Sequence, residues 1–208
     1  LLARLPLRSE DRFVFLGDYI DRGPDSRGVV DRLIDLSSAH QCTFLIGNHE
    51  SMFLDFIGWK APQYFGGDAF LSNGGARTLA SYGYFDGDDP QPEQLQLPKS
   101  HVRFYENLKL HHKDGDYLFV HAGLASDDLL SGDLRYVLRR ARPQDLLWNR
   151  SHIGQPNTLG VTIVFGHTPN PDFAVHWHAP YSIGIDTGAT YGGWLTALRL
   201  PDETLFQA

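Results

Sequence analysis

The stretch LGDYIDRGPDSR, from Leu16 to Arg27, is the part of the chain richest in chemically active side chains. The apolar run Phe13 to Leu16 predicts a short buried strand, and Asp18 follows one residue after it. Asp21 and Arg22 come next, and the letters GPDS are turn sequence that can begin a helix. The stretch therefore predicts a strand, a loop carrying charged groups, and a helix.

The same arrangement recurs three times downstream. Apolar runs over residues 43–46, 117–120 and 162–165 are followed by GNHE, HAG and GHTP. In α/β folds, groups just past the carboxyl ends of buried strands share one crevice, so we expect side chains far apart in sequence to converge. These side chains are Asp18, Asn48, His49, His121 and His167. Carboxylate, amide oxygen and imidazole suit a divalent ion such as manganese, iron or zinc.

The order GDYIDRG, GNHE, HAG, GHTP resembles the metallophosphoesterase superfamily. It is most similar to the bacterial members of the phosphoprotein phosphatase family, which include the symmetrical diadenosine tetraphosphatases. The resemblance spans residues 11–200 and includes LSNGGARTLASYG, LLWNR and IDTGATYGG. It implies a calcineurin-like α/β fold, in which two mixed β-sheets are sandwiched between helices in αββα layers. The length fits one α/β domain, so we expect residues 1–208 to form a single domain.

The resemblance implies a dinuclear metal centre, with manganese favoured and iron or zinc as alternatives. Asp18 matches the bridging carboxylate, and Asn48, His121 and His167 match the other ligands of one ion. Taken alone, Asp18 could instead cap a helix. The family's other ion depends on an Asp-X-His motif in an earlier strand, which nothing in this sequence matches. We therefore expect an N-terminally truncated chain that lacks this strand.

The resemblance also implies the catalytic residues. His49 matches the general acid that protonates the leaving group, and Asp21 matches the carboxylate that orients it. Arg22 and Arg150 match two arginines that hold phosphate oxygens. The alternative for Asp21 is an ion pair with its neighbour Arg22.

Other polar residues have simpler interpretations. Asp186, in IDTGA, either supports a metal ligand or belongs to a turn at a strand end. His176 and His178 alternate as on one face of a strand, but no third ligand accompanies them, so we do not assign them a metal. His111 and His112 are expected on the solvated surface. The motif Asn73-Gly74-Gly75 belongs to the resemblance without a chemical role, and acidic, Pro-rich and Gln-rich residues 86–98 predict a surface loop.

The function that the resemblance implies is hydrolysis of a phosphoester by metal-activated water. The favoured substrate is a phosphorylated serine or threonine on a protein, and the alternative is a symmetrical dinucleoside tetraphosphate. A hypothesis of another class is a non-catalytic relic that kept the fold for binding. The residues upstream of Leu1 would separate an enzyme from a relic.

The amino-acid composition bears on the binding partners of the chain and on its cellular compartment. The chain has 18 basic and 25 acidic side chains and a formal net charge of −7, which does not support a broad basic face for nucleic acid. A single cysteine, Cys42, fits a reducing cytosol, so we expect a cytoplasmic protein. No apolar run approaches the length needed to span a membrane. The expected partner is therefore the phosphorylated protein or nucleotide substrate, and the oligomeric state stays open.

Overall fold

The computed structural model describes residues 1–84 and 95–208. It comprises two compact units. The N-terminal unit is Ser9–Leu110, and the C-terminal unit combines Leu1–Arg8 with His111–Ala208. The loop expected over residues 86–98 lies outside the described residues up to position 94, and residues 95–98 have no regular structure.

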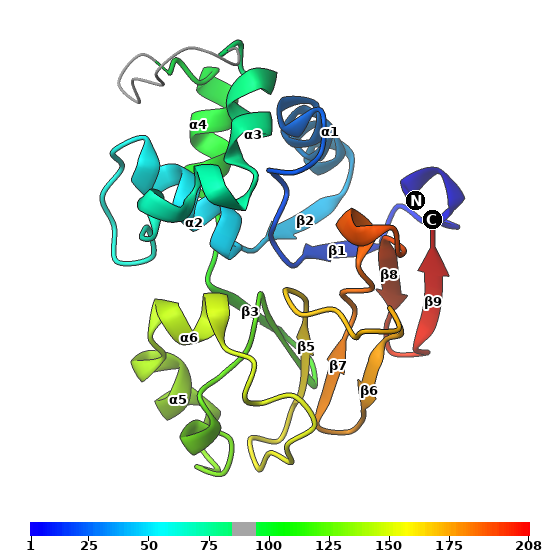
Figure 1. The fold of residues 1–208 in the computed structure, drawn as a ribbon. Helices are drawn as coiled ribbons and strands as arrows, with labels where there is room; N and C mark the ends of the chain where they lie inside the picture. The colour runs from blue at the N-terminus through cyan, green and yellow to red at the C-terminus, as the bar shows by residue number, and fades with distance from the viewer. Residues whose placement is uncertain (85–94) are drawn as a thin grey trace. The chain divides into compact units, whose positions relative to one another are not determined.

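The N-terminal unit is built on two parallel strands, β1 (Arg12–Phe15) and β2 (Gln41–Phe44). Parallel neighbours need a crossover, and here it is the helix α1 (Ser26–Ala39) (Figure 1). The carboxylate of Asp25 caps this helix by accepting a hydrogen bond from the Gly28 backbone N–H at 2.8 Å. The predicted order of strand, charged loop and helix is confirmed.

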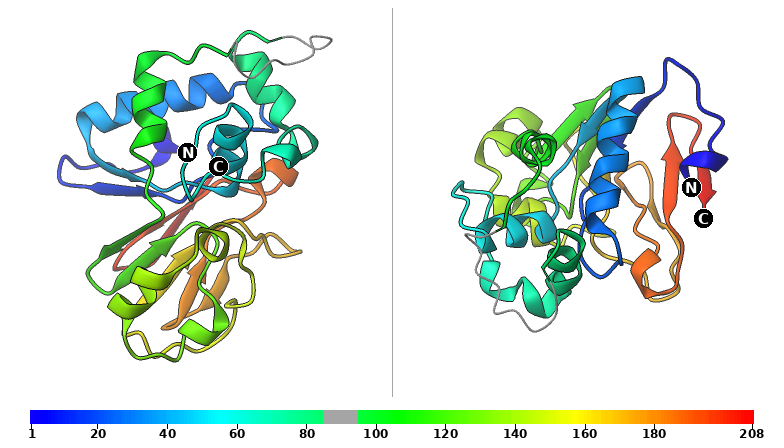
Figure 2. Two further views of the ribbon diagram at one scale, coloured as in Figure 1. Left: turned by 90° about the vertical axis from the view of Figure 1, so that its left-hand side faces the viewer. Right: turned by 90° about the horizontal axis from the view of Figure 1, so that it is seen from above.

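Three further helices complete the N-terminal unit: α2 (Asn48–Phe56), α3 (Gly75–Ser81) and α4 (Lys99–Glu106). Short 3-10 turns, Gly67–Ala69 and Leu71–Asn73, connect α2 to α3. Figure 2 shows α1, α3 and α4 grouped together. Aromatic rings fill the core between the helices: Phe53 lies 5.4 Å from Phe70 and 5.6 Å from Tyr105, and all three are fully buried.

The structure places the GNHE motif at the start of α2, whereas the sequence analysis described it only as the residues that follow an apolar strand. The helix begins at Asn48, because the Glu50 side chain accepts a hydrogen bond from the Gly47 N–H at 2.8 Å and caps the first turn. It ends at Phe56, two residues before Gly58, whose φ is +84°. Asn48 and His49 therefore belong to a helix and not to a loop.

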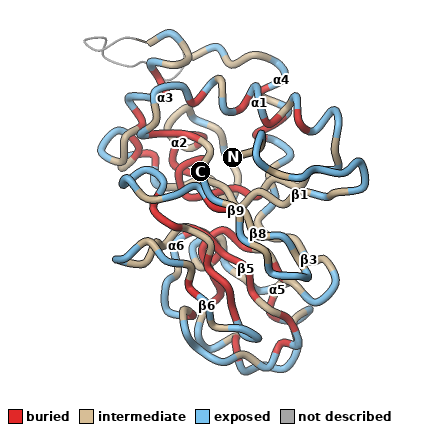
Figure 3. Tube along the Cα trace, turned by 90° about the vertical axis from the view of Figure 1, so that its right-hand side faces the viewer, coloured by how far each residue is buried: buried red, intermediate tan, exposed pale blue. Residues whose placement is uncertain are grey.

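The C-terminal unit contains a five-stranded mixed sheet in the order β3-β4-β5-β7-β6. Its strands are β3 (His111–Asp114), β4 (Tyr117–Val120), β5 (Thr162–Phe165), β6 (His176–His178) and β7 (Ser182–Gly184). The central strands β4, β5 and β7 run parallel, whereas both edge strands are antiparallel to their neighbours. The bounds predicted for β4 and β5 are confirmed, and Figure 3 shows buried residues along β5.

Short helices and a hairpin complete this unit. The helices α5 (Leu134–Arg140) and α6 (Pro143–Trp148) and the 3-10 turn Ser126–Asp128 connect β4 to β5. After the 3-10 turn Ala189–Tyr191, the strands β8 (Thr196–Arg199) and β9 (Thr204–Gln207) form an antiparallel hairpin. The 3-10 turn Leu2–Arg4 lies beside β9, where Arg4 donates a hydrogen bond to the Gln207 carbonyl at 3.3 Å (Figure 1).

His111 and His112 were expected on the solvated surface, but both are half-buried in β3. The ring of His112 stacks on Phe119 of the paired strand, with 6.1 Å between the ring centres. Within the described parts of the chain, every helix is too short or too polar to cross a bilayer.

Candidate active site

The loop after β1 has an unusual backbone. Asp18, Asp21 and Arg22 all adopt left-handed conformations, with φ of 59°, 72° and 60°. Such values are uncommon for residues other than glycine, and they persist only where surrounding contacts hold them. The three residues are among those that the sequence analysis assigned to the site.

A buried carboxylate from α2 holds this loop. Glu50 is 0% exposed, and one of its oxygens accepts hydrogen bonds from the N–H groups of Asp18 at 2.9 Å and Gly47 at 2.8 Å. The other oxygen accepts from the Tyr19 N–H at 2.7 Å. Burial, followed by the charge of Asp18, raises the pKa of Glu50 to about 7. The sequence analysis gave Glu50 no role, although its position three residues after Gly47 is a capping-box signal.

The Asp18 carboxylate lies at the start of α2. Its Oδ1 accepts a hydrogen bond from the His49 N–H at 3.2 Å, so Asp18 caps α2 and not the helix that follows it in sequence. A Cβ at Gly47 would overlap this carboxylate, which explains the glycine there. Asn48, the first residue of α2, is 3% exposed. The structure therefore brings Asp18, Asn48 and His49 together past the carboxyl ends of β1 and β2.

His49 and Asp21 form a buried pair. The distance between His49 Nδ1 and Asp21 Oδ2 is 2.6 Å, and the two side chains are 4% and 0% exposed. Burial lowers the pKa of His49, but the Asp21 hydrogen bond and the charges of Asp18 and Asp21 outweigh it, so the pKa is raised. Burial raises the pKa of Asp21, against the hydrogen bonds from His49 and Thr78. A protonated imidazole is therefore favoured, as a proton donor requires.

The buried hydroxyl groups of Thr78 and Ser26 both contact Asp21. Thr78 Oγ1 donates a hydrogen bond to Asp21 Oδ1 at 2.6 Å and accepts one from the Asp21 N–H at 2.9 Å. Ser26 Oγ lies 3.1 Å from the same N–H and 3.0 Å from Thr78 Oγ1. Sequence reasoning missed both residues. Thr78 is 57 residues from Asp21, and no local pattern links them.

The Asn73-Gly74-Gly75 motif now has a structural reason. The Arg22 N–H donates a hydrogen bond to the Gly74 carbonyl at 3.3 Å. Gly74 has a φ of +99°, and a Cβ on it would lie 2.9 Å from Arg22 Cγ. The glycine therefore gives the backbone and the side chain of Arg22 room beside the entry to α3, and Arg22 itself is exposed.

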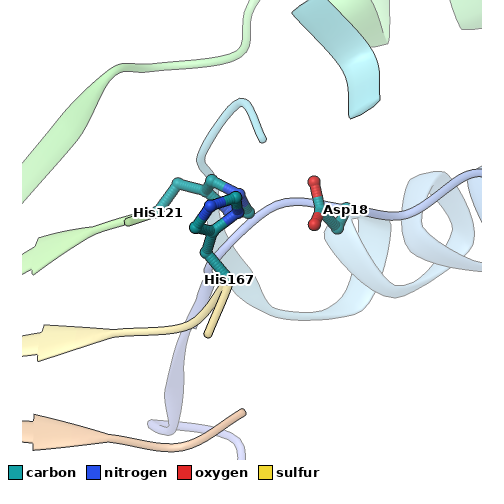
Figure 4. Close-up of side chains that lie close together, drawn as sticks. All are labelled: Asp18, His121 and His167. Carbon is teal, nitrogen blue, oxygen red and sulfur yellow. The ribbon is translucent and has the colours of Figure 1, made fainter. Parts of the chain in front are cut away.

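In the C-terminal unit, two histidines follow adjacent parallel strands. His121 comes directly after β4 and His167 two residues after β5, and the distance from His121 Nε2 to His167 Nδ1 is 3.2 Å. Figure 4 shows the two imidazoles side by side, and it also labels Asp18 of the N-terminal unit. His167 has a φ of 64°. Trp148 meets the His167 ring edge-on, with 5.7 Å between the ring centres.

The structure also places the other polar residues that the sequence analysis named. Arg150 is exposed after the end of α6. Asp186 follows β7, and its Oδ1 accepts a hydrogen bond from the Gly188 N–H at 3.0 Å, as expected for a turn at a strand end. His176 and His178 lie on β6, where His176 Nε2 donates to the Thr168 carbonyl at 3.1 Å.

Comparison with known proteins gives a consistent set of relatives. The model of the family described as calcineurin-like phosphoesterase matches residues 1–195. The chain is 27% identical over 202 residues to the bis(5'-nucleosyl)-tetraphosphatase PrpE [asymmetrical] of Anoxybacillus flavithermus, covering 92% of this chain and 76% of the relative. It is 29% identical over 220 residues to the protein of the same name in Geobacillus thermodenitrificans, covering 96% and 80%.

One solved structure shares the fold. A candidate diadenosine tetraphosphatase superposes with a TM-score of 0.62 at 19% identity, covering 95% of this chain and 80% of that one. At this level of identity the superposition establishes a shared fold.

Proposed function

The chain belongs to the calcineurin-like phosphoesterase family, and from this premise we propose that it hydrolyses dinucleoside polyphosphates with the help of divalent metal ions. The observation that carries the chemistry is the buried pair of His49 and Asp21, 2.6 Å apart, in the loop and helix that also carry Asp18. A proton donor at the leaving oxygen accelerates hydrolysis of a phosphate ester or anhydride when that oxygen is basic, and this pair is arranged to be such a donor.

The proposed metal ligands are Asp18, Asn48, His121 and His167. Two of them, the imidazoles of His121 and His167, already turn ring nitrogens toward each other at 3.2 Å, as two ligands of one cation would. Carboxylate, amide and imidazole groups together suit manganese, iron or zinc. We propose manganese; the family resemblance implies two such ions, and these four residues match the ligands of one of them. When bound, such ions polarise phosphoryl oxygens and lower the pKa of bound water.

The protein's own side chains have separate tasks in this proposal. His49 Nδ1–H donates to Asp21, which leaves Nε2 to pass a proton to the leaving oxygen as the phosphorus–oxygen bond breaks. Asp21 fixes the ring and favours its charged form. The planar guanidinium groups of Arg22 and Arg150 hold phosphate oxygens.

The relatives' names support the nucleotide substrate. Both relatives are called bis(5'-nucleosyl)-tetraphosphatases, and both are called asymmetrical. A phosphorylated serine or threonine is the second candidate, because the order of GDYIDRG, GNHE, HAG and GHTP resembles the phosphoprotein phosphatases. Both substrates present a tetrahedral phosphorus with a leaving oxygen, so the same residues would serve either.

The substrates can be compared directly. The purified chain with manganese would be assayed against diadenosine tetraphosphate and a phosphoserine peptide, with products separated by chromatography. We expect the nucleotide to be cleaved with the higher kcat/KM, and asymmetrical cleavage to give a mononucleotide and a triphosphate. Two diphosphates would mean symmetrical cleavage, and faster hydrolysis of the peptide would make the chain a protein phosphatase. Hydrolysis of neither would favour the non-catalytic relic.

The role of His49 has its own test. Replacing His49 with Asn should lower kcat by a factor on the order of 10² to 10⁴, because general acid catalysis is lost. The metal content, measured by elemental analysis, should stay unchanged. Loss of metal together with activity would make His49 a ligand instead of a proton donor.

A further inference from the structure

The Asp21 carboxylate has a different partner on each oxygen. Oδ2 faces His49 Nδ1 at 2.6 Å, and Oδ1 accepts the Thr78 hydroxyl at 2.6 Å. Thr78 belongs to α3, is 0% exposed, and also accepts the Asp21 N–H at 2.9 Å. One hydroxyl thus contacts both the backbone and the side chain of the residue that holds His49.

The hydrogen-bond roles in this cluster are fixed by the number of protons. Thr78 has one hydroxyl proton, and the acceptor-only carboxylate of Asp21 takes it. Ser26 Oγ, at 3.0 Å, must then donate its own proton to Thr78 while it accepts from the Asp21 N–H. Among the described residues of this cluster, Thr78 is therefore the hydroxyl that donates to Oδ1.

We propose that Thr78 is a positioning residue for the general acid: it fixes the carboxylate of Asp21, and Asp21 in turn fixes the ring of His49. Asp21 needs this support because it adopts a left-handed conformation, with a φ of 72°. If the carboxylate of Asp21 could rotate about its side-chain bonds, the imidazole of His49 could turn as well. Its Nε2 would then no longer point at the leaving oxygen of the substrate. The inference rests on the proposed function, in which His49 is that acid.

The test uses substrates that differ in their need for an acid. Phenyl phosphate has a basic leaving oxygen that must be protonated, whereas 2,4-dinitrophenolate leaves without a proton. Replacing Thr78 with Val keeps the shape and removes the hydroxyl. We expect kcat on phenyl phosphate to fall by about 10- to 100-fold, and kcat on dinitrophenyl phosphate by less than about 3-fold, with KM little changed. Thr78→Ser, which keeps the hydroxyl, should stay within about 3-fold of the wild type on both substrates.

Two controls separate positioning from stability. Thr196→Val, in β8, removes another buried hydroxyl, which is hydrogen-bonded to the Thr187 hydroxyl at 2.5 Å and to the Gln207 side chain at 3.0 Å. This variant should change kcat by the same factor on both substrates. Thermal denaturation would verify that each variant is folded. If Thr78→Val does not accumulate as folded protein, Thr78→Ala, which also lacks the hydroxyl, should give the same selective loss.

The variant His49→Asn separates a failure of the proposed function from a failure of the inference about Thr78. It should show a strong dependence on the leaving group, and if it does not, His49 is not the acid and the proposed function fails at that residue. If His49→Asn shows the dependence and the Thr78 variants without a hydroxyl do not, the inference about Thr78 is overturned while the proposed function stands. Thr78→Ser as impaired as Thr78→Val would overturn it equally.

Discussion

Glu50 shows how one buried side chain holds the loop that carries Asp18. Both of its oxygens accept backbone N–H groups, at 2.7 to 2.9 Å, from Gly47, Asp18 and Tyr19. A carboxylate suits this place because it is an acceptor on both sides. An amide would have to direct its own N–H group at one of these donors.

Replacing Glu50 with Gln should therefore destabilise the protein despite the similar shape. We expect a loss of about 2 to 3 kcal/mol in the free energy of unfolding at pH 8, because a buried donor is left without an acceptor. Urea denaturation followed by fluorescence measures it. The matched control is Glu106→Gln, at the exposed end of α4, which should change the stability by less than about 0.5 kcal/mol. Equal effects would show that the carboxylate is not needed.

His152 is a buried imidazole without a hydrogen-bond partner on either ring nitrogen, as judged over the described residues. It is 1% exposed, and its ring meets Phe165 edge-on at 4.5 Å between centres. Burial, followed by the charge of His176, lowers the pKa of His152 to about 4. The folded protein therefore requires the neutral ring.

Stability should consequently fall in acid. The folded pKa of about 4 lies below the ordinary value of 6.5, so the unfolded chain binds the extra proton first, and stability is lost as the pH falls from about 6.5 to about 4. For this residue we expect a loss of about 2 kcal/mol between pH 7 and pH 5. Comparing urea denaturation of the wild type and His152→Leu at both pH values isolates the effect. A wild type and variant with identical pH dependence would contradict it.

At the scale of an element, the entry to α3 positions Arg22. Gly74 has a φ of +99°, and a Cβ on it would lie 2.9 Å from Arg22 Cγ. At the far end of α3, Gly83 has a φ of +100°, and a Cβ on it would meet no atom within 4 Å among the described residues. The two glycines thus have the same backbone requirement and differ in what surrounds them.

Alanine at either position should cost about 1 kcal/mol of stability, because its Cβ disfavours a positive φ. Only Gly74→Ala should also impair hydrolysis, and we expect kcat/KM to fall at least about 10-fold as Arg22 is displaced. Steady-state kinetics and thermal denaturation of both variants provide the measurement. Gly83→Ala with the same kinetic defect would show that strain in α3, and not Arg22, is the cause.

The elements that the sequence predicts well are those with a strong local signal. Each of the four predicted strands is present within two residues of its expected bounds, because an apolar run ended by polar residues marks a strand directly. The start of α2 was not predicted, because its cap comes from a glutamate inside the helix. Thr78 could not be found at all, since its partner Asp21 is distant in sequence and the contact exists only in the fold.

At the scale of the whole molecule, we expect metal binding to be coupled to folding. An ion that binds only the folded protein stabilises it by mass action, by about 2.7 kcal/mol at a concentration 100 times its dissociation constant. Metal binding is therefore visible as a rise in the melting temperature.

We expect manganese to raise the melting temperature of the chelator-treated wild type. Asp18→Asn and His167→Asn should each abolish most of this rise, because each removes a ligand of the same ion. His178→Asn, in β6, is the control and should keep the full rise. A full rise in Asp18→Asn would mean that Asp18 is not a ligand of this ion.

The fold and the type of reaction were the properties that the sequence predicted best. The ordered motifs predicted the calcineurin-like α/β fold and a metal-dependent phosphoesterase, and the family match over residues 1–195 confirms both. The choice of substrate, manganese as the metal, the site residues, the single domain and the cytoplasmic location stay predictions. The motifs recur in proteins that act on different phosphates, so these letters specify the reaction and leave the substrate open.

The left-handed residues of the site imply a conflict between two kinds of selection. Asp18, Asp21, Arg22 and His167 each hold a backbone conformation that glycine or asparagine would adopt at lower cost. A library screened for heat resistance alone should therefore enrich glycine and asparagine at these four positions, while a library screened for turnover should exclude them. Thermostabilised forms of this enzyme are best sought by leaving these positions fixed and varying residues remote from them.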